Sequence, residues 1–163
     1  MQDISHISSF DSILKTIQPR THIFCDIDDT VLKVNMTDSK CFAQGCFSQD
    51  YMCPTDATGF YALYNLVNSK QISGKLSFLT ARNVKDDIIT RMQLSNLGIP
   101  VTRDVLDIYY TNNMMNKGDY MKMYLKDHVN SGMPIVFIDD RPTEVFSVWA
   151  MFPHIKCYVY TAK

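Results

Sequence analysis

The sequence predicts an α/β fold in which helices cover both faces of a mainly parallel sheet of about five strands. Short apolar runs alternate along the chain with segments whose apolar residues recur at helical spacing. This alternation is typical of right-handed βαβ crossovers, which build parallel sheets. A chain of 163 residues is long enough for one core of this kind, so residues 1–163 are expected to form a single domain.

The N-terminal third is expected to hold a helix, a strand and a long insertion. Apolar residues recur at helical spacing over 4–17, and Pro19 ends that helix. The apolar run at 22–26 predicts a buried first strand. Residues 35–55 have no clear period and exceed the usual length of a connection, which indicates a small flap or cap-like insertion.

Caps and breakers delimit the remaining elements. Thr55 or Asp56 is placed to cap a helix that runs to about residue 69, and Gly98 stops a second helix over 84–96. Apolar runs predict the second to fifth strands, and periodic segments between them predict two further helices. These strands are 76–79, 108–111, 135–138 and 156–160, and these helices are 117–129 and 142–151.

Composition argues against several classes of protein. The net charge of −1 at pH 7 and the scattered basic residues give no support for binding to nucleic acid or to an anionic membrane. No apolar stretch is long enough to span a bilayer, and the start lacks the basic and apolar regions of a signal peptide, although a leader removed beforehand would leave the same start. We expect a cytoplasmic protein.

The five cysteines point the same way. An odd number, with Cys25 inside the first strand, argues against a disulfide framework and fits a reducing compartment. Cys41, Cys46 and Cys53 lack the spacing of a zinc site, so unpaired thiols are expected there.

Polar residues follow three of the apolar runs. The first strand leads into Asp26, Asp28, Asp29 and Thr30, the second into Thr80 and Arg82, and the fourth into Asp139 and Asp140, while Lys117 opens the helix after the third. The carboxyl ends of parallel strands lie at one edge of the sheet, where ligands bind, so these side chains can share a pocket. Several carboxylates in one pocket repel, and a hard cation such as Mg²⁺ relieves the repulsion. A lysine and a threonine then supply the charge and the donor that a phosphoryl oxygen needs, and a carboxylate can attack phosphorus.

The motifs I-F-C-D-I-D-D-T-V-L, S-F-L-T-A-R, N-K-G and F-I-D-D occur in this order. Together they resemble the four motifs of the haloacid-dehalogenase-like (HAD) superfamily of phosphohydrolases with an aspartate nucleophile. The runs around T-A-R and Y-T-N also resemble an uncharacterised branch of that superfamily with little or no cap. The resemblance implies a three-layer Rossmann-like fold with strand order 5-4-1-2-3.

The resemblance also implies a role for each matching residue. Asp26 is the implied nucleophile and Asp28 the implied general acid and base, as in phosphatases rather than dehalogenases. Thr80 and Lys117 are the implied phosphate ligands, and Thr30 braces the loop. The implied Mg²⁺ ligands are Asp26, Asp28 through its carbonyl, Asp139, and Asp140 directly or through a water. The implied function is a Mg²⁺-dependent phosphomonoester phosphatase that acts through an aspartyl-phosphate.

Several assignments stay open at this stage. Asp29 is read as a turn residue rather than a catalytic acid, and Asn112 and Asn113 as turn residues that tolerate the left-handed region. Arg82 either touches substrate or pairs with a carboxylate. The four histidines are read as surface or packed residues, and Met114 and Met115 as residues that could rim the pocket.

The function also has alternatives. Phosphotransfer passes through the same intermediate as hydrolysis, and a catalytically silent binding module could keep the fold. The order of the acidic motifs disfavours a receiver domain. The short gap between Thr80 and Lys117 leaves no room for a large cap, so the phosphorylated substrate is either macromolecular or a small molecule covered by a partner subunit.

Overall fold

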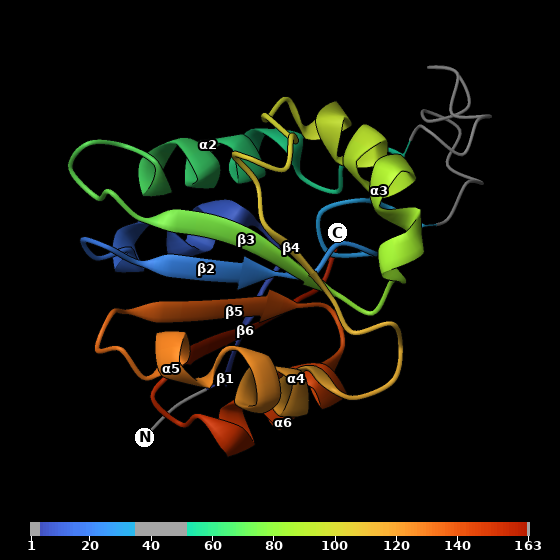
Figure 1. Cartoon of the computed structure of the whole chain (residues 1–163). Coiled ribbons are helices and arrows are strands. Elements are labelled where there is room, and N and C mark those ends of the chain that lie inside the picture. The colour runs from blue at the N-terminus through green and yellow to red at the C-terminus, as the bar shows by residue number, and fades with distance from the viewer. Residues whose placement is uncertain (1–3, 35–51, 163) are drawn as a thin grey trace.

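A six-stranded parallel sheet runs through the centre of the protein (Figure 1). The computed structural model describes residues 4–34 and 52–162. The strands follow the order β1-β6-β5-β2-β3-β4, and each neighbouring pair is parallel. The carboxyl ends of β2, β3 and β5 therefore lie along one edge, on the right in Figure 1.

The described elements have the following bounds. The strands are β1 (Ile4–Ile7), β2 (His22–Cys25), β3 (Lys75–Thr80), β4 (Ile108–Tyr110), β5 (Ile135–Asp139) and β6 (Lys156–Tyr160). The α-helices are α2 (Ala57–Val67), α3 (Asp87–Leu94), α4 (Lys117–Tyr124), α5 (Lys126–Val129) and α6 (Pro142–Met151). The 3₁₀ helices are η1 (Phe10–Thr16), η2 (Val84–Asp86) and η3 (Ser95–Leu97).

Two apolar cores lie on opposite faces of the sheet. One packs α2 and η1 against the sheet around Phe10, Phe60 and Phe78. The other packs α4 and α6 around Phe137 and Val148. Figure 1 shows the resulting three layers, with α2 and α3 above the sheet and α4, α5 and α6 below it. The α/β class and helices on both faces are as the sequence predicts.

The N-terminal segment differs from the prediction. The expected strand order 5-4-1-2-3 corresponds to β6-β5-β2-β3-β4, which the structure contains, but a sixth strand lies outside β6. Ile4–Ile7 pairs with β6, with Ile4 opposite Cys157, where a helix over 4–17 was expected. A strand turns Ile4 toward one core and Ile7 toward the other, so both bury apolar surface. The free edge of β6, a long-range partner, decides the conformation.

Two other helices also differ from the expected ones. The helix expected over 117–129 is divided at Leu125, whose φ of −125° separates α4 from α5. The helix expected over 84–96 begins and ends as 3₁₀ turns, and Gly98 closes it in the left-handed region with φ of 78°. Asp56 caps α2 by accepting a hydrogen bond from the Gly59 amide, as the sequence predicts.

The expected flap at 35–55 lies mostly outside the described residues. Its described ends run side by side: the Lys33 amide donates to the Cys53 carbonyl at 2.8 Å, and the Thr55 amide donates to the Val31 carbonyl at 3.0 Å. The insertion thus leaves and rejoins the fold at one place.

Cys53 is disulfide-bonded, which contradicts the expectation of an unpaired thiol at this position. The cysteine count therefore no longer argues for a reducing compartment. Among the described helices, none has the length and apolar character needed to cross a membrane.

His22 is a packed histidine at the end of the sheet opposite the acidic residues. Its ring stacks on Phe24, its Nε2 lies 2.9 Å from Ser77 Oγ, and its Nδ1 contacts the Nε2 of His128. Burial lowers the pKa of His22 to about 3, and the charges of His128 and Lys75 add to the effect against that of Asp107. His22 is therefore neutral in the folded protein.

A neutral buried histidine makes stability depend on pH. The unfolded chain binds a proton near pH 6.5 and the folded chain does not, so stability is present above that pH and is lost as the pH falls toward 3. We expect His22→Gln to remove up to about 2 kcal/mol of the fall in unfolding free energy between pH 7 and pH 5, measured by urea denaturation. His6→Gln, at an exposed position of β1, is the control and should keep the wild-type slope. Equal slopes in both variants would show that His22 does not carry this dependence.

Candidate active site

The site lies where β2 and β5 end side by side. Their register places Cys25 opposite Ile138, and the Asp26 amide donates to the Ile138 carbonyl at 2.9 Å. The next residue on each strand is an aspartate, so Asp26 and Asp139 end in the same place. Both side chains are buried. The apolar runs thus carry two carboxylates to one point of the sheet edge.

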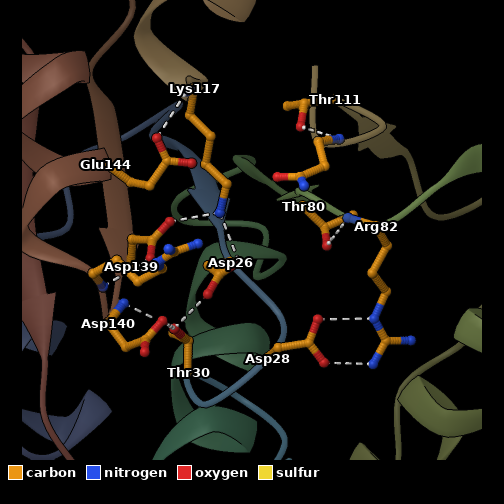
Figure 2. A network of polar contacts seen from close by, with 12 residues as sticks. Asp26, Asp28, Thr30, Thr80, Arg82, Thr111, Lys117, Asp139, Asp140 and Glu144 are labelled. Carbon is orange, nitrogen blue, oxygen red and sulfur yellow. Dashed lines mark hydrogen bonds and ion pairs between the residues drawn. The ribbon is translucent and has the colours of Figure 1, made fainter. Parts of the chain in front are cut away.

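Lys117 lies between these carboxylates. Its Nζ is 2.6 Å from Asp26 Oδ1 and 2.5 Å from Asp139 Oδ2 (Figure 2). Burial alone would lower the pKa of Lys117, but the two carboxylates outweigh it and hold the pKa above its usual value. The lysine therefore stays charged and neutralises part of the acidic cluster.

Close packing of α4 on α6 aims Lys117 at the strand ends. A Cβ built on Gly118 would lie 2.1 Å from the Ser147 carbonyl oxygen, so only glycine allows this approach. Asn116 caps α4 through a hydrogen bond from the Asp119 amide at 2.7 Å. These two neighbours fix where the helix starts, and hence where Lys117 points.

Thr30 joins the second oxygen of Asp26 to the end of β5. Its hydroxyl donates to Asp26 Oδ2 at 2.9 Å and accepts from the Asp140 amide at 3.0 Å. The loop returns Thr30 to this point because Asp29 takes the left-handed region with φ of 59°. The turn reading of Asp29 agrees with this geometry, as does the bracing role of Thr30.

Three carboxylates form a group that fits a divalent cation. One oxygen from each of Asp26, Asp139 and Asp140 lies within 4.8 Å of the others. Burial and the charge of Asp26 raise the pKa of Asp139. Burial, followed by contact with Asp26, raises the pKa of Asp140 to about 6. Within residues 4–34 and 52–162, Lys117 is the one lysine that pairs with this cluster, so negative charge remains in excess there, and oxygen ligands of this kind suit Mg²⁺.

Asp28 faces away from this group. Its Oδ1 accepts from Nη2 of Arg82 at 2.7 Å and its Oδ2 from Nε at 3.0 Å (Figure 2). The other N–H groups of Arg82 reach Thr90, Gln93 and the Met52 sulfur. All five guanidinium donors are engaged, so Arg82 has none left for a substrate in this arrangement. Of the two alternatives for Arg82, pairing with a carboxylate is the one observed.

Thr80 ends β3, the neighbour of β2 on the side opposite β5. It is buried, and its hydroxyl accepts the Arg82 amide at 3.1 Å. Asp26 therefore has Thr80 on one side and Asp139 on the other (Figure 2). The contact of Thr80 with phosphate stays a prediction.

A pocket of about 290 Å³ opens above these residues. Asp26, Asp28, Asp29, Ala81, Lys117, Asp140, Arg141 and Glu144 line it. Arg141 and Glu144 are outside the motifs, although Arg141 directly follows the Asp139-Asp140 pair and Glu144 comes three residues after Arg141. The Glu144 carboxylate accepts a hydrogen bond from the Lys117 amide at 3.2 Å, which connects α6 to the start of α4.

Comparison with solved structures agrees with this topology. The chain has a haloacid-dehalogenase-like fold. A chain of the Pnkp1/Rnl/Hen1 complex matches 88% of it with a TM-score of 0.59 at 17% identity, and this protein spans 47% of that chain's length. The class C acid phosphatase from Bacillus anthracis matches 92% of this chain and 70% of its own, with a TM-score of 0.54 at 15% identity.

A third match is the N-terminal part of BF1531 from Bacteroides fragilis, described as containing a phosphatase domain complexed with Mg. It covers 90% of this chain and 38% of its own, with a TM-score of 0.53 at 15% identity. No protein-family model and no curated protein matches the sequence. At these identities the likeness concerns the fold.

The ion pairs of Lys117 should matter for stability. Lys117→Met leaves Asp26 and Asp139 as buried carboxylates without their counter-charge, so we expect a loss of about 3–5 kcal/mol in unfolding free energy at pH 7. The loss should shrink at lower pH, where the carboxylates can be protonated. Lys75→Met breaks the exposed pair with Asp107 and should cost under about 1 kcal/mol by the same urea titration. Equal losses of unfolding free energy in the two variants would show that the buried ion pairs of Lys117 do not stabilise the fold more than an exposed pair does.

Proposed function

We propose that this protein is a Mg²⁺-dependent phosphomonoester phosphatase that forms an aspartyl-phosphate on Asp26. The observation that carries the proposal is the position of Asp26. Its two oxygens are oriented by Lys117 and Thr30, and the carboxylates of Asp139 and Asp140 lie beside it. The HAD-like fold, which the chain shares with solved phosphatases, supports the proposal.

The reaction has two displacements. An oxygen of Asp26 attacks phosphorus, the ester P–O bond breaks, and the departing oxygen takes a proton from Asp28. A water then attacks the aspartyl-phosphate while Asp28 accepts its proton, and phosphate leaves with Asp26 restored. Lys117 places a fixed positive charge beside the reacting oxygen. Thr80 and Lys117 hold the phosphoryl oxygens in this scheme.

The cation would be held by the carboxylates of Asp26, Asp139 and Asp140, together with the main-chain carbonyl of Asp28. When bound, it neutralises charge on the phosphoryl oxygens. The excess negative charge of the three carboxylates over one lysine supports a role for a cation here. Lys117 is already bonded to two of the acids, so it orients them with or without a cation.

Asp28 has to turn for this chemistry. It lines the pocket, but its carboxylate is paired with Arg82. Proton transfer requires Asp28 to reach the ester oxygen, about a hydrogen bond away. We therefore assign Arg82 a positioning role, in which it holds Asp28 between turnovers. Transfer to an acceptor other than water would use the same residues.

The nucleophile assignment predicts the effect of an isosteric change. Asp26→Asn should abolish Mg²⁺-dependent release of phosphate from 4-nitrophenyl phosphate, because an amide oxygen is a poor nucleophile, and EDTA should abolish the wild-type activity reversibly. Asp29→Asn is the matched control from the same loop. Asparagine also tolerates the left-handed region at this position, so this variant should keep activity near that of the wild type. Activity retained by Asp26→Asn would contradict the assignment of Asp26 as the nucleophile.

The acid role of Asp28 predicts a dependence on the leaving group. Asp28→Asn should lose about 10²–10⁴-fold on an alkyl phosphate, whose alkoxide must be protonated as it leaves. With 4-nitrophenyl phosphate, whose phenolate needs no proton, the variant should show a rapid burst of nitrophenolate followed by slow turnover, measured by stopped flow. Equal losses on both substrates, without a burst, would contradict the acid role.

A further inference from the structure

Three pockets adjoin through shared lining residues, from Asp26 at the carboxyl edge of the sheet to β4 and α4, and together they are called the groove. The pocket over Asp26 shares Arg141 and Glu144 with a second pocket. The second shares Met114 and Met115 with a third. The third has no residue in common with the first, so the second lies between the two ends.

The middle pocket is mainly polar. Besides the shared residues, it is lined by Asn113, Asn116 and Thr143. Amide, hydroxyl, guanidinium and carboxylate groups can each donate to or accept from a hydroxyl group. This part of the groove therefore suits a hydroxylated segment of a ligand.

The far pocket is larger and aromatic. It measures about 410 Å³, and Tyr109 of β4 lines it together with Tyr120 and Tyr124 of α4. The Tyr120 and Tyr124 rings lie 4.8 Å apart, and those of Tyr109 and Tyr120 lie 6.5 Å apart. Burial raises the pKa of Tyr109 and of Tyr120, so their hydroxyls stay protonated.

The outer wall of this pocket is apolar but open to solvent. Met114 is 79% exposed and Tyr124 is 60% exposed, although both are large side chains that gain from burial. Tyrosine faces and a flexible methionine are good surfaces for a flat ring. Stacking on aromatic side chains accepts any nucleobase.

We propose that this groove binds the leaving group of the substrate, and that this group is an aromatic ring joined to the phosphate by a hydroxylated spacer. This is the chemistry of a nucleoside monophosphate. The inference rests on the proposed phosphatase function, which supplies the phosphate at Asp26. A ring bonded directly to the phosphate, as in phosphotyrosine, has no hydroxylated spacer to occupy the polar pocket that lies between Asp26 and the tyrosines. The spacer is what carries the ring to Tyr120 and Tyr124.

The test compares substrates that differ only in the ring. Wild-type protein should hydrolyse adenosine 5′-monophosphate with kcat/KM at least about tenfold above that for ribose 5-phosphate. Tyr124→Ala should remove most of this ratio, mainly through KM, whereas Tyr124→Phe keeps the ring and should keep the ratio. Met123→Ala is the matched control, because Met123 is an exposed neighbour on α4 that does not line the groove. A ratio near one in the wild type, or one unchanged by Tyr124→Ala, overturns the proposal.

Direct binding separates this proposal from the proposed function. Adenosine 5′-monophosphate should bind the Asp26→Asn variant in calorimetry, and adding Tyr124→Ala should weaken this binding about tenfold. Ring-dependent binding without turnover in the wild type would support the groove and reject the phosphatase. Turnover with no ring preference in rate or binding would support the phosphatase and reject the groove.

Two further outcomes would overturn the proposal that the groove binds a nucleoside monophosphate. Phosphotyrosine turnover equal to that of the nucleotide, with the same loss in Tyr124→Ala, would reject the spacer. A wild-type dimer that Tyr124→Ala converts to a monomer in sedimentation would make this surface an interface between two copies of the chain.

Discussion

The ammonium group of Lys117, held between two buried carboxylates, is the interaction on which the site depends. Charges taken out of water are stable only when they are paired and hydrogen-bonded, and Asp26, Asp139 and Lys117 satisfy one another at 2.6 and 2.5 Å. Each comes from a different element, so the pairing fixes β2, β5 and α4 relative to one another. Removing Lys117 would leave Asp26 and Asp139 as buried carboxylates without their counter-charge, whereas removing one aspartate would leave Lys117 paired with the other.

The register of the sheet and a close helix contact make this pairing possible. Parallel pairing of β2 with β5 brings two aspartates to the same height, and Gly118 lets α4 approach α6 closely enough for Lys117 to reach them. Asp29, in the left-handed region, folds the next loop back so that Thr30 holds the second oxygen of Asp26. The backbone geometry of the strands, the helix contact and the turn therefore positions the side chains of the acidic cluster.

The sequence predicts those features that depend on neighbouring residues alone, such as the ends of buried strands. Apolar runs that end in aspartate located Asp26 and Asp139, because a buried strand can carry carboxylates only at its end. The strand at Ile4–Ile7 escaped prediction because its partner β6 lies at the other end of the chain. Pairing of Arg82 with a carboxylate was one of two open alternatives, but the choice of Asp28 as partner was not predicted, since it depends on where α3 places Thr90 and Gln93. Arg141 and Glu144 were within reach, because they follow an aspartate pair at the start of a helix.

Two acids separated by one residue thus meet opposite conditions. Asp26 is buried, and its partner Lys117 is almost fully enclosed, so moving it would expose a costly set of unpaired charges. The side chain of Asp28 is 37% exposed, and water can replace Arg82 around it, so leaving that pair costs far less. A nucleophile has to be held still, whereas a group that gives a proton and later takes one has to move. The proposed division of labour between Asp26 and Asp28 follows this difference in burial.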